Sequence, residues 1–134
     1  MPPRLELVRD WLIMAQKDLS AARMLLKGDP PLLEAGCFHC QQALEKAFKA
    51  ILLHNEQRPP RTHNLADLIG LCERWAKGLA EYESRCSWLT ACAVDARYPD
   101  NSVDLTPESA DDALATTEEV FAFVLKHIPP EAHP

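Results

Sequence analysis

The sequence lacks the features that mark several protein classes. No apolar run approaches the roughly 20 residues that a membrane-spanning helix needs. The N-terminal stretch MPPRLELVRDW has no hydrophobic region of the kind found in a signal peptide. The chain also contains no Walker loop, GxGxxG, HExxH or GxSxG motif, so the enzyme classes that these motifs mark are not indicated. We therefore expect a cytoplasmic protein without membrane attachment.

Positive charge is also scarce. There are 14 Lys and Arg residues against 20 Asp and Glu residues, which gives a formal net charge of −6. Broad, unspecific binding of nucleic acid depends on basic residues that displace counterions, so it is not expected, although a local basic patch is compatible with the sequence. The 134 residues are 47% hydrophobic and 25% charged, an ordinary globular composition. This length suits one core, and we predict a single domain over residues 1–134.

The five cysteines mostly occupy apolar-periodic positions, and their number is odd. In a reducing compartment such residues are expected to be thiols that act as small hydrophobic side chains. Cys37 and Cys40, with His39 between them, also have the spacing of a redox pair or of half a zinc site. No strand precedes them, as a redox motif requires, and no second pair supplies further zinc ligands. We therefore predict core cysteines, no metal site and no cofactor.

Helical periodicity dominates the chain, and no alternating strand pattern appears. A first helix is predicted from about Leu5 to Lys27, where apolar residues recur every three or four positions until Gly28 and two prolines end the pattern. A second helix spans Leu32 to Glu56, and Gly36 in its first turns indicates close packing against the first helix. Its apolar residues form an arc wide enough to contact several helices; they are Cys37, Cys40, Ala43, Leu44, Ala47, Phe48, Ala50 and Ile51.

Two shorter helical segments follow. Thr62 or Asn64 can cap a third helix, which weakens at Gly78. A fourth helix is predicted from about Ala80 or Tyr82 to Ala96. It ends there because Pro99 disfavours a helical conformation at the residue before it.

The last helix begins at Thr106, with Pro107 at its first helical position. Pro129 and Pro130 end it, and the remaining tail is expected to fray. Together the segments predict an all-α fold, an up-down helical bundle of four long helices plus one shorter helix.

The side of the second helix opposite its apolar arc carries a polar stripe. It consists of His39, Gln42, Lys46 and Lys49, whose spacings of three, four and three place them on one face. Two lysines one turn apart can clasp a phosphate, and His39 can donate a further hydrogen bond. The alternative is a solvated helix face or a set of intramolecular ion pairs, for example with Glu34 or Glu45.

Two other places offer candidate binding residues. His63 precedes the third helix, where it can act in capping or can point a polar group toward the bundle mouth, near a helix end that favours anions. In the turn at 97–100, Arg97 can bind phosphate, and Tyr98 can stack or donate its hydroxyl. The alternative for this turn is a capped helix end held by an Arg–Asp pair.

Four pieces of sequence, in order, resemble the HEPN domain family. The first helix has Trp11-x3-Ala15-x2-Asp18-Leu19-x2-Ala22, and residues 37–50 read CFHCQQALEKAFKA, where the family has a QQAxEKxxKA core. The stretch Thr62-His63-Asn64-Leu65-x2-Leu68 resembles the family's H-(D/N)-L-x2-L step, and Arg97-Tyr98-Pro99-Asp100 resembles its RYP turn. The resemblance spans about residues 8 to 125. It implies a compact α-helical bundle, often a homodimer.

The resemblance also implies a link to nucleotides. Many HEPN proteins are encoded beside a minimal nucleotidyltransferase and bind it, in toxin–antitoxin pairs or two-subunit transferases. The expected function is thus a non-catalytic subunit that binds a nucleotide or a nucleotidyltransferase partner. The family motif carries over these ligand-binding positions: Gln42, Lys46, Lys49, His63, Arg97 and Tyr98.

Two alternatives remain open. One HEPN branch cleaves RNA without a metal through an Arg-x(4–6)-His motif. No histidine follows Arg97 at that distance, and the literal match from Arg58 to His63 begins in a Pro-Pro loop, so ribonuclease activity and RNA binding are less favoured. Tyr98 directly follows Arg97, so the Arg-x(4–6)-Tyr spacing of a nucleotidylated branch is also absent. The other alternative is a purely structural dimerisation module.

Overall fold

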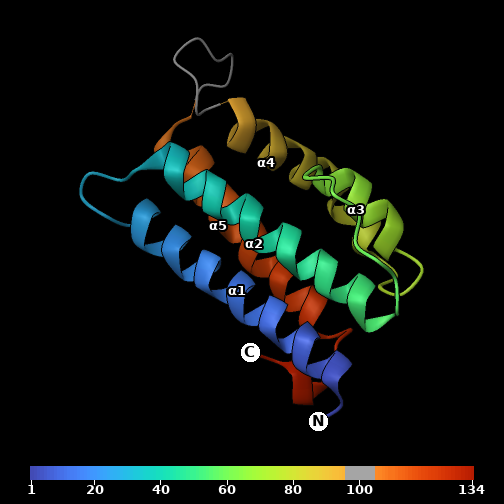
Figure 1. Cartoon of the computed structure of the whole chain (residues 1–134). Helices are drawn as coiled ribbons and strands as arrows, with labels where there is room; N and C mark the ends of the chain where they lie inside the picture. The colour runs from blue at the N-terminus through green and yellow to red at the C-terminus, as the bar shows by residue number, and fades with distance from the viewer. Residues whose placement is uncertain (96–104) are drawn as a thin grey trace.

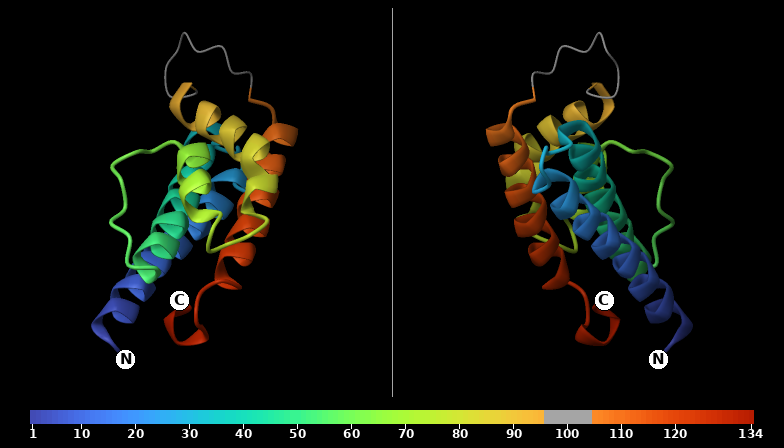
Figure 2. Two further views of the ribbon diagram at one scale, coloured as in Figure 1. Left: turned by 90° about the vertical axis from the view of Figure 1, so that its right-hand side faces the viewer. Right: turned by 90° about the vertical axis from the view of Figure 1, so that its left-hand side faces the viewer.

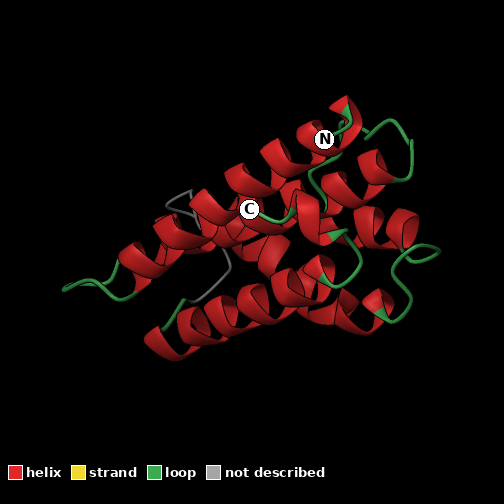
Figure 3. Ribbon diagram, turned by 90° about the horizontal axis from the view of Figure 1, so that it is seen from below, coloured by secondary structure: helices red, strands yellow, loops and turns green. Residues whose placement is uncertain are grey.

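The computed structural model describes residues 1–95 and 105–134, and every regular element within these ranges is helical (Figure 3). The elements are α1 (Pro3–Leu26), α2 (Leu33–His54), α3 (Leu65–Cys72), the 3₁₀ turn η1 (Leu79–Tyr82), α4 (Glu83–Asp95), α5 (Pro107–Leu125) and the 3₁₀ turn η2 (Pro130–Ala132). The predicted all-α class is confirmed. None of the helices in the described ranges is long and apolar enough to cross a membrane.

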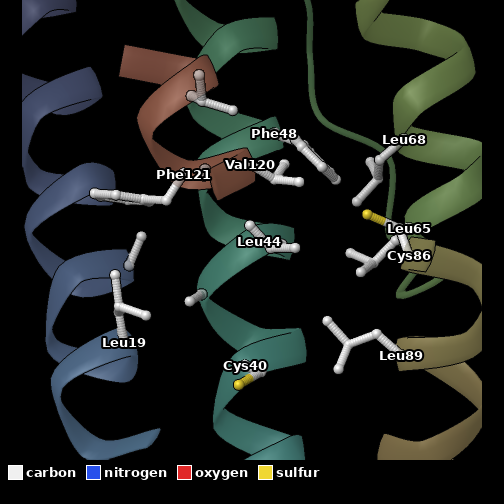
Figure 4. Close-up of a cluster of buried hydrophobic side chains, with 14 of the residues drawn as sticks. Leu19, Cys40, Leu44, Phe48, Leu65, Leu68, Cys86, Leu89, Val120 and Phe121 are labelled. Atoms are coloured by element: carbon white, nitrogen blue, oxygen red, sulfur yellow. The ribbon is translucent and has the colours of Figure 1, made fainter. Parts of the chain in front are cut away.

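Helix α2 is the centre of the bundle. It runs antiparallel beside α1, with α5 packed behind the pair and with α3 and α4 on its other side (Figures 1 and 2). In the core, Leu44 and Phe48 of α2 lie between Leu19 and Phe121 on one side and Leu65 on the other (Figure 4). All apolar residues of the predicted α2 arc are buried. The width of the arc predicted contacts with several helices, and α2 does contact α1, α3, α4 and α5.

The antiparallel helices α1 and α2 approach each other closely. The predicted α1 seam is buried from Val8 to Leu26. Gly36 of α2 lies opposite the end of α1, and a β-carbon added to it would overlap the side chain of Leu26. The glycine is thus needed for the close approach of the two helices, as its position in the sequence predicted.

Helix α3 is shorter than the prediction, because it ends at Cys72 rather than near Gly78. The carboxylate of Glu73 accepts hydrogen bonds from the backbone N–H groups of Gly78 (3.0 Å) and Ala80 (2.8 Å). These bonds, with Gly78 contributing most, hold the pKa of the Glu73 carboxyl below its usual range. Gly78 has a φ of 99°, a left-handed conformation that glycine adopts without strain. The side chain thus stabilises a turn where we predicted further helix, and α4 begins only at Glu83.

The two ends of α5 differ in how well they were predicted. Thr106 caps the helix as expected, in a reciprocal pair with Ser109. The tail is not frayed, which corrects the prediction. Its Ala132 is buried in a 3₁₀ turn that packs against α1, and His133 Nε2 donates to the carbonyl of Leu125 (2.8 Å). The prolines after Ile128 end the α-helix but begin this turn.

The cysteines are all buried thiols, as predicted. Burial raises the pKa of the Cys37 thiol to about 11 and that of the Cys40 thiol to about 12. A redox pair requires a thiolate near neutral pH, so these two side chains serve as core residues. Within the described ranges, no group of three His, Cys, Asp or Glu side chains is arranged to hold a metal ion.

Candidate functional site

The polar stripe of α2 is divided between two ion-pair clusters. In each cluster one carboxylate oxygen accepts a hydrogen bond from a lysine, and the other oxygen faces Nδ1 of a histidine. The Asp18 cluster consists of Asp18, His39 and Lys46. The Glu45 cluster consists of Glu45, Lys49 and His63. Neither lysine is therefore an uncommitted charge on an exposed helix face.

The Asp18 cluster joins α1 to α2. His39 Nδ1 lies 2.9 Å from Oδ1 of Asp18, and Lys46 Nζ donates to Oδ2. The side-chain oxygen of Gln42 also accepts from Lys46, at 3.4 Å. The sequence left an intramolecular ion pair as an alternative role for Lys46, and the structure has such a pair. Its partner is Asp18 of α1 rather than Glu34 or Glu45.

The Glu45 cluster joins α2 to the segment that precedes α3. Lys49 Nζ donates to Oε2 of Glu45 at 3.1 Å, and His63 Nδ1 lies 3.0 Å from Oε1. The Glu45 and Lys49 side chains are only 8% and 9% exposed, whereas the His63 side chain is 78% exposed. A carboxylate bound to lysine acts only as an acceptor, so Nδ1 of His63 carries a proton. In the neutral imidazole, Nε2 is then a hydrogen-bond acceptor on the exposed side of the ring.

A groove of about 560 Å³ lies beside the Glu45 cluster. Its lining residues come from α2, from the end of the connection to α3 and from the last turns of α4. That connection runs back along α2 (Figure 2). Its volume falls within the range of about 300–1,000 Å³ that is common for small-molecule sites. The lining residues are Phe38, Gln41, Gln42, Thr62, His63, Asn64, Thr90, Ala93 and Val94.

Gln41 fixes the walls of this groove. Its buried side chain donates to the carbonyl of His63 (2.6 Å) and accepts from the hydroxyl of Thr90 (3.1 Å). Thr90 in turn accepts from the N–H of Leu65 at 3.4 Å. One amide thus connects α2, the segment before α3 and α4, so the groove has a defined shape.

The structure brings some of the predicted site residues together and separates others. Gln42 and His63 line the same groove. His39 and Lys46 are not among its lining residues and instead pair with Asp18 of α1, and Lys49 is buried beside Glu45. Arg97 and Tyr98 lie outside the described residues, so their proposed roles stay predictions.

The sequence reasoning missed several residues that shape this site. Asp18 belongs to the first-helix motif but was not considered as a partner for the stripe. Glu45 was named as a possible ion-pair partner of the stripe; it precedes Lys49 by four residues, the usual spacing for a helical ion pair, and it does pair with Lys49. Asn64 was predicted only as a cap. It does cap α3, by accepting a hydrogen bond from the N–H of Asp67 (3.2 Å), and it also lines the groove. Nothing in the sequence connects Gln41 to Thr90.

A second, smaller groove of about 400 Å³ lies between α4 and α5. Arg85 and Trp88 line it, and Arg85 donates to the hydroxyl of Thr116 (3.1 Å) and to the carboxylate of Glu119 (2.6 Å). None of the predicted site residues within the described ranges lies there. The groove beside the Glu45 cluster is therefore the better candidate site.

The fold and site define a helical bundle with a polar groove on its central helix. The chain belongs to the HEPN family: the model of the HEPN domain matches residues 8–128. The structure is similar to that of TT1696 from Thermus thermophilus, with 26% sequence identity and a TM-score of 0.79 over 91% of this chain and 98% of that one. It is also similar to ST0689, an archaeal HEPN homologue, with 26% identity and a TM-score of 0.71 over 90% and 97% of the two chains. No functionally curated protein matches the chain.

Proposed function

We propose that this chain is a non-catalytic HEPN subunit that binds a nucleotide in the groove beside the Glu45 cluster and acts with a minimal nucleotidyltransferase. The proposal includes a homodimer and a role in a toxin–antitoxin pair. The observation that carries it is the meeting of two family-motif positions, Gln42 and His63, in one groove of suitable size.

The groove supports binding more directly than it supports catalysis. An acid–base nuclease needs two polar groups near the same phosphate. His63 leaves Nε2 exposed, but the arginine at the literal motif spacing, Arg58, is exposed and is not among the described residues that line the groove. The sequence and the geometry therefore both favour a binding subunit.

A nucleotide titration tests the ligand part of this proposal. The full chain is titrated calorimetrically with each of the four ribonucleoside triphosphates. We expect saturable binding of at least one, weakened about tenfold or more by Gln42→Ala and by His63→Ala, because each removes a hydrogen-bonding group from the groove. Ser84→Ala, in the groove between α4 and α5, is the matched control and should leave affinity unchanged. No binding to any of the four would contradict the proposal.

The partner is tested by recovering the tagged chain from its native cells and identifying the retained proteins by mass spectrometry. A small nucleotidyltransferase, recovered in stoichiometric amount, is the expected result. Light scattering on the purified chain should give twice the mass of the 15.0 kDa protomer. Recovery of the chain with no transferase would contradict the partner, and a monomeric mass would contradict the dimer.

An RNA cleavage assay separates binding from ribonuclease activity. The purified chain, without added metal, is incubated with structured and single-stranded RNA. We expect no cleavage. Cleavage that disappears in His63→Ala would instead establish the nuclease alternative and would identify His63 as its acid or base.

A further inference from the structure

Helix α1 forms an outer edge of the bundle and has a face that no other described element covers. It packs against α2, α5 and η2 (Figure 1). On its remaining surface Leu7 is 46% exposed and Met14 is 54% exposed, although both side chains are apolar. Neither residue contributes to the core, so the fold of one chain does not explain why these positions are apolar.

These two residues belong to one apolar stripe. Leu7, Trp11 and Met14 follow one another at spacings of four and three residues, so they are neighbours on one side of the helix. Trp11 is partly exposed, and the stripe ends at Asp18, which is bound within the Asp18 cluster. Single exposed apolar side chains are common on protein surfaces, whereas a continuous apolar stripe indicates an interaction surface. Tryptophan and methionine are also enriched at such surfaces.

Two opposite charges adjoin the centre of this stripe. Asp10 lies four residues before Met14, and Lys17 lies three residues after it, so both are neighbours of Met14 on the helix surface. Both side chains are exposed, and among the described residues neither belongs to an ion pair. The stripe therefore has one free negative charge toward its beginning and one free positive charge toward its end.

This pattern is complementary to itself when two α1 helices lie antiparallel. A two-fold axis between Trp11 and Met14 places Trp11 of each copy against Met14 of the other, and Asp10 opposite Lys17. The midpoints of these two residue pairs differ by one position, about 1.5 Å along the helix, so one axis serves both. In a parallel pair, each charge would instead lie level with its own copy, and like charges would face each other.

We propose that the exposed face of α1 is the interface of a homodimer, in which α1 packs antiparallel against α1 of a second copy. This inference rests on the dimer in the proposed function and names the surface that forms it. The apolar stripe supplies most of the affinity, because its burial removes apolar surface from water. The exposed pairs of Asp10 with Lys17 fix the antiparallel orientation and add little affinity.

The main test is analytical ultracentrifugation of the full chain and of Met14→Glu. The wild type should sediment as a dimer. Met14→Glu places two carboxylates near the axis, so it should weaken the dimer about 100-fold or more. Leu71→Glu makes the same kind of change at a similarly exposed position of α3, 48% exposed, and should leave the dimer intact. Circular dichroism checks that both variants are folded.

Charge reversal tests the orientation, at exposed positions where the fold tolerates substitution. Asp10→Lys and Lys17→Asp each place like charges opposite one another twice in the antiparallel dimer. Each should weaken it about tenfold at low salt. The double variant Asp10→Lys with Lys17→Asp restores both pairs with their signs exchanged, so its affinity should return to within about threefold of the wild type.

The possible failures can be told apart. A wild-type dimer that persists unchanged in Met14→Glu, or that Leu71→Glu weakens equally, would overturn the α1 interface but keep the proposed homodimer. Single charge variants without effect, or a double variant no tighter than the single ones, would overturn the antiparallel pairing. A wild-type chain that is monomeric at its highest soluble concentration would overturn this inference together with the dimer in the proposed function, while the nucleotide titration would still stand by itself.

Discussion

The Asp18 and Glu45 clusters contain the same three kinds of group, a carboxylate between a lysine and a histidine, but they differ in their surroundings. In the Asp18 cluster the lysine side chain is 18% exposed and the histidine 33% exposed. In the Glu45 cluster the ion pair is more deeply buried, while His63 is mostly exposed and lines a groove. The first cluster joins two helices along their length. The second holds one imidazole in place at a candidate binding site.

The difference shows that residue type and spacing do not determine the role of a polar cluster. A partly exposed pair contributes less to stability than a buried one because water competes for both charges. A buried pair is sensitive to the loss of one member, since the other charge is then left in the interior. The Glu45 cluster is a candidate for function because its ion pair is buried while its histidine is exposed.

The largest expected effect is that of Glu45→Ala. Removal of this carboxylate leaves the buried Lys49 ammonium without its partner, so the free energy of unfolding should fall by about 3–5 kcal/mol. Urea denaturation followed by circular dichroism measures the change. The double variant Glu45→Ala with Lys49→Met should recover much of the loss, because it removes the unpaired charge. A loss in Glu45→Ala below about 1 kcal/mol would show that the pair is effectively solvated.

Asp18→Ala should have a smaller effect than Glu45→Ala, because Lys46 is closer to solvent. We expect a loss of about 1–2 kcal/mol in the free energy of unfolding, from the hydrogen bonds to Lys46 and His39. Asp10→Ala, at an exposed position of α1, is the matched control and should change stability by less than about 0.5 kcal/mol. If Asp18→Ala costs as much as Glu45→Ala, the proposed difference in burial between the clusters is wrong.

Gly36→Ala examines whether packing also holds α1 to α2. The added methyl group would overlap Leu26, which costs about 1–3 kcal/mol, and the better helix propensity of alanine returns about 1 kcal/mol. A net loss of about 1 kcal/mol is expected. Gly70→Ala is the control, because no atom lies within 4 Å of its added β-carbon; it should stabilise α3 slightly. Stabilisation by both substitutions would mean that the contact with Leu26 relaxes at no cost.

The helices could be predicted because their signals are local. The seam of α1, the arc of α2 and the caps at Asn64 and Thr106 depend on residues at most a few turns apart. The end of α3 could not be predicted, since it depends on a carboxylate that binds backbone groups in a later turn. Nor could the ordered tail, whose Ala132 is buried in a turn that packs against α1.

The candidate site was only partly predictable for the same reason. Gln42 and His63 were identified, and the spacing of Glu45 and Lys49 left their pairing as an alternative. The partner of Lys46 depends on how α1 is aligned against α2, and helical periodicity does not determine that alignment. Gln41 lies at the edge of the polar face, where its role becomes apparent only when α4 brings Thr90 beside it.

Substitution of either histidine should have the smallest effect on stability. These two variants nevertheless give the clearest comparison of the functions of the two clusters. His39→Ala should lower the free energy of unfolding by about 0.5–1 kcal/mol, since a half-buried hydrogen bond to Asp18 is lost. His63→Ala should change it by less than about 0.5 kcal/mol, because that side chain is mostly exposed. Ligand affinity should show the opposite order, with a clear loss only in His63→Ala. Urea denaturation and calorimetric titration of the same two proteins make the test. Equal loss of affinity in both would mean that the two clusters form one site, and the separation drawn between them would be wrong.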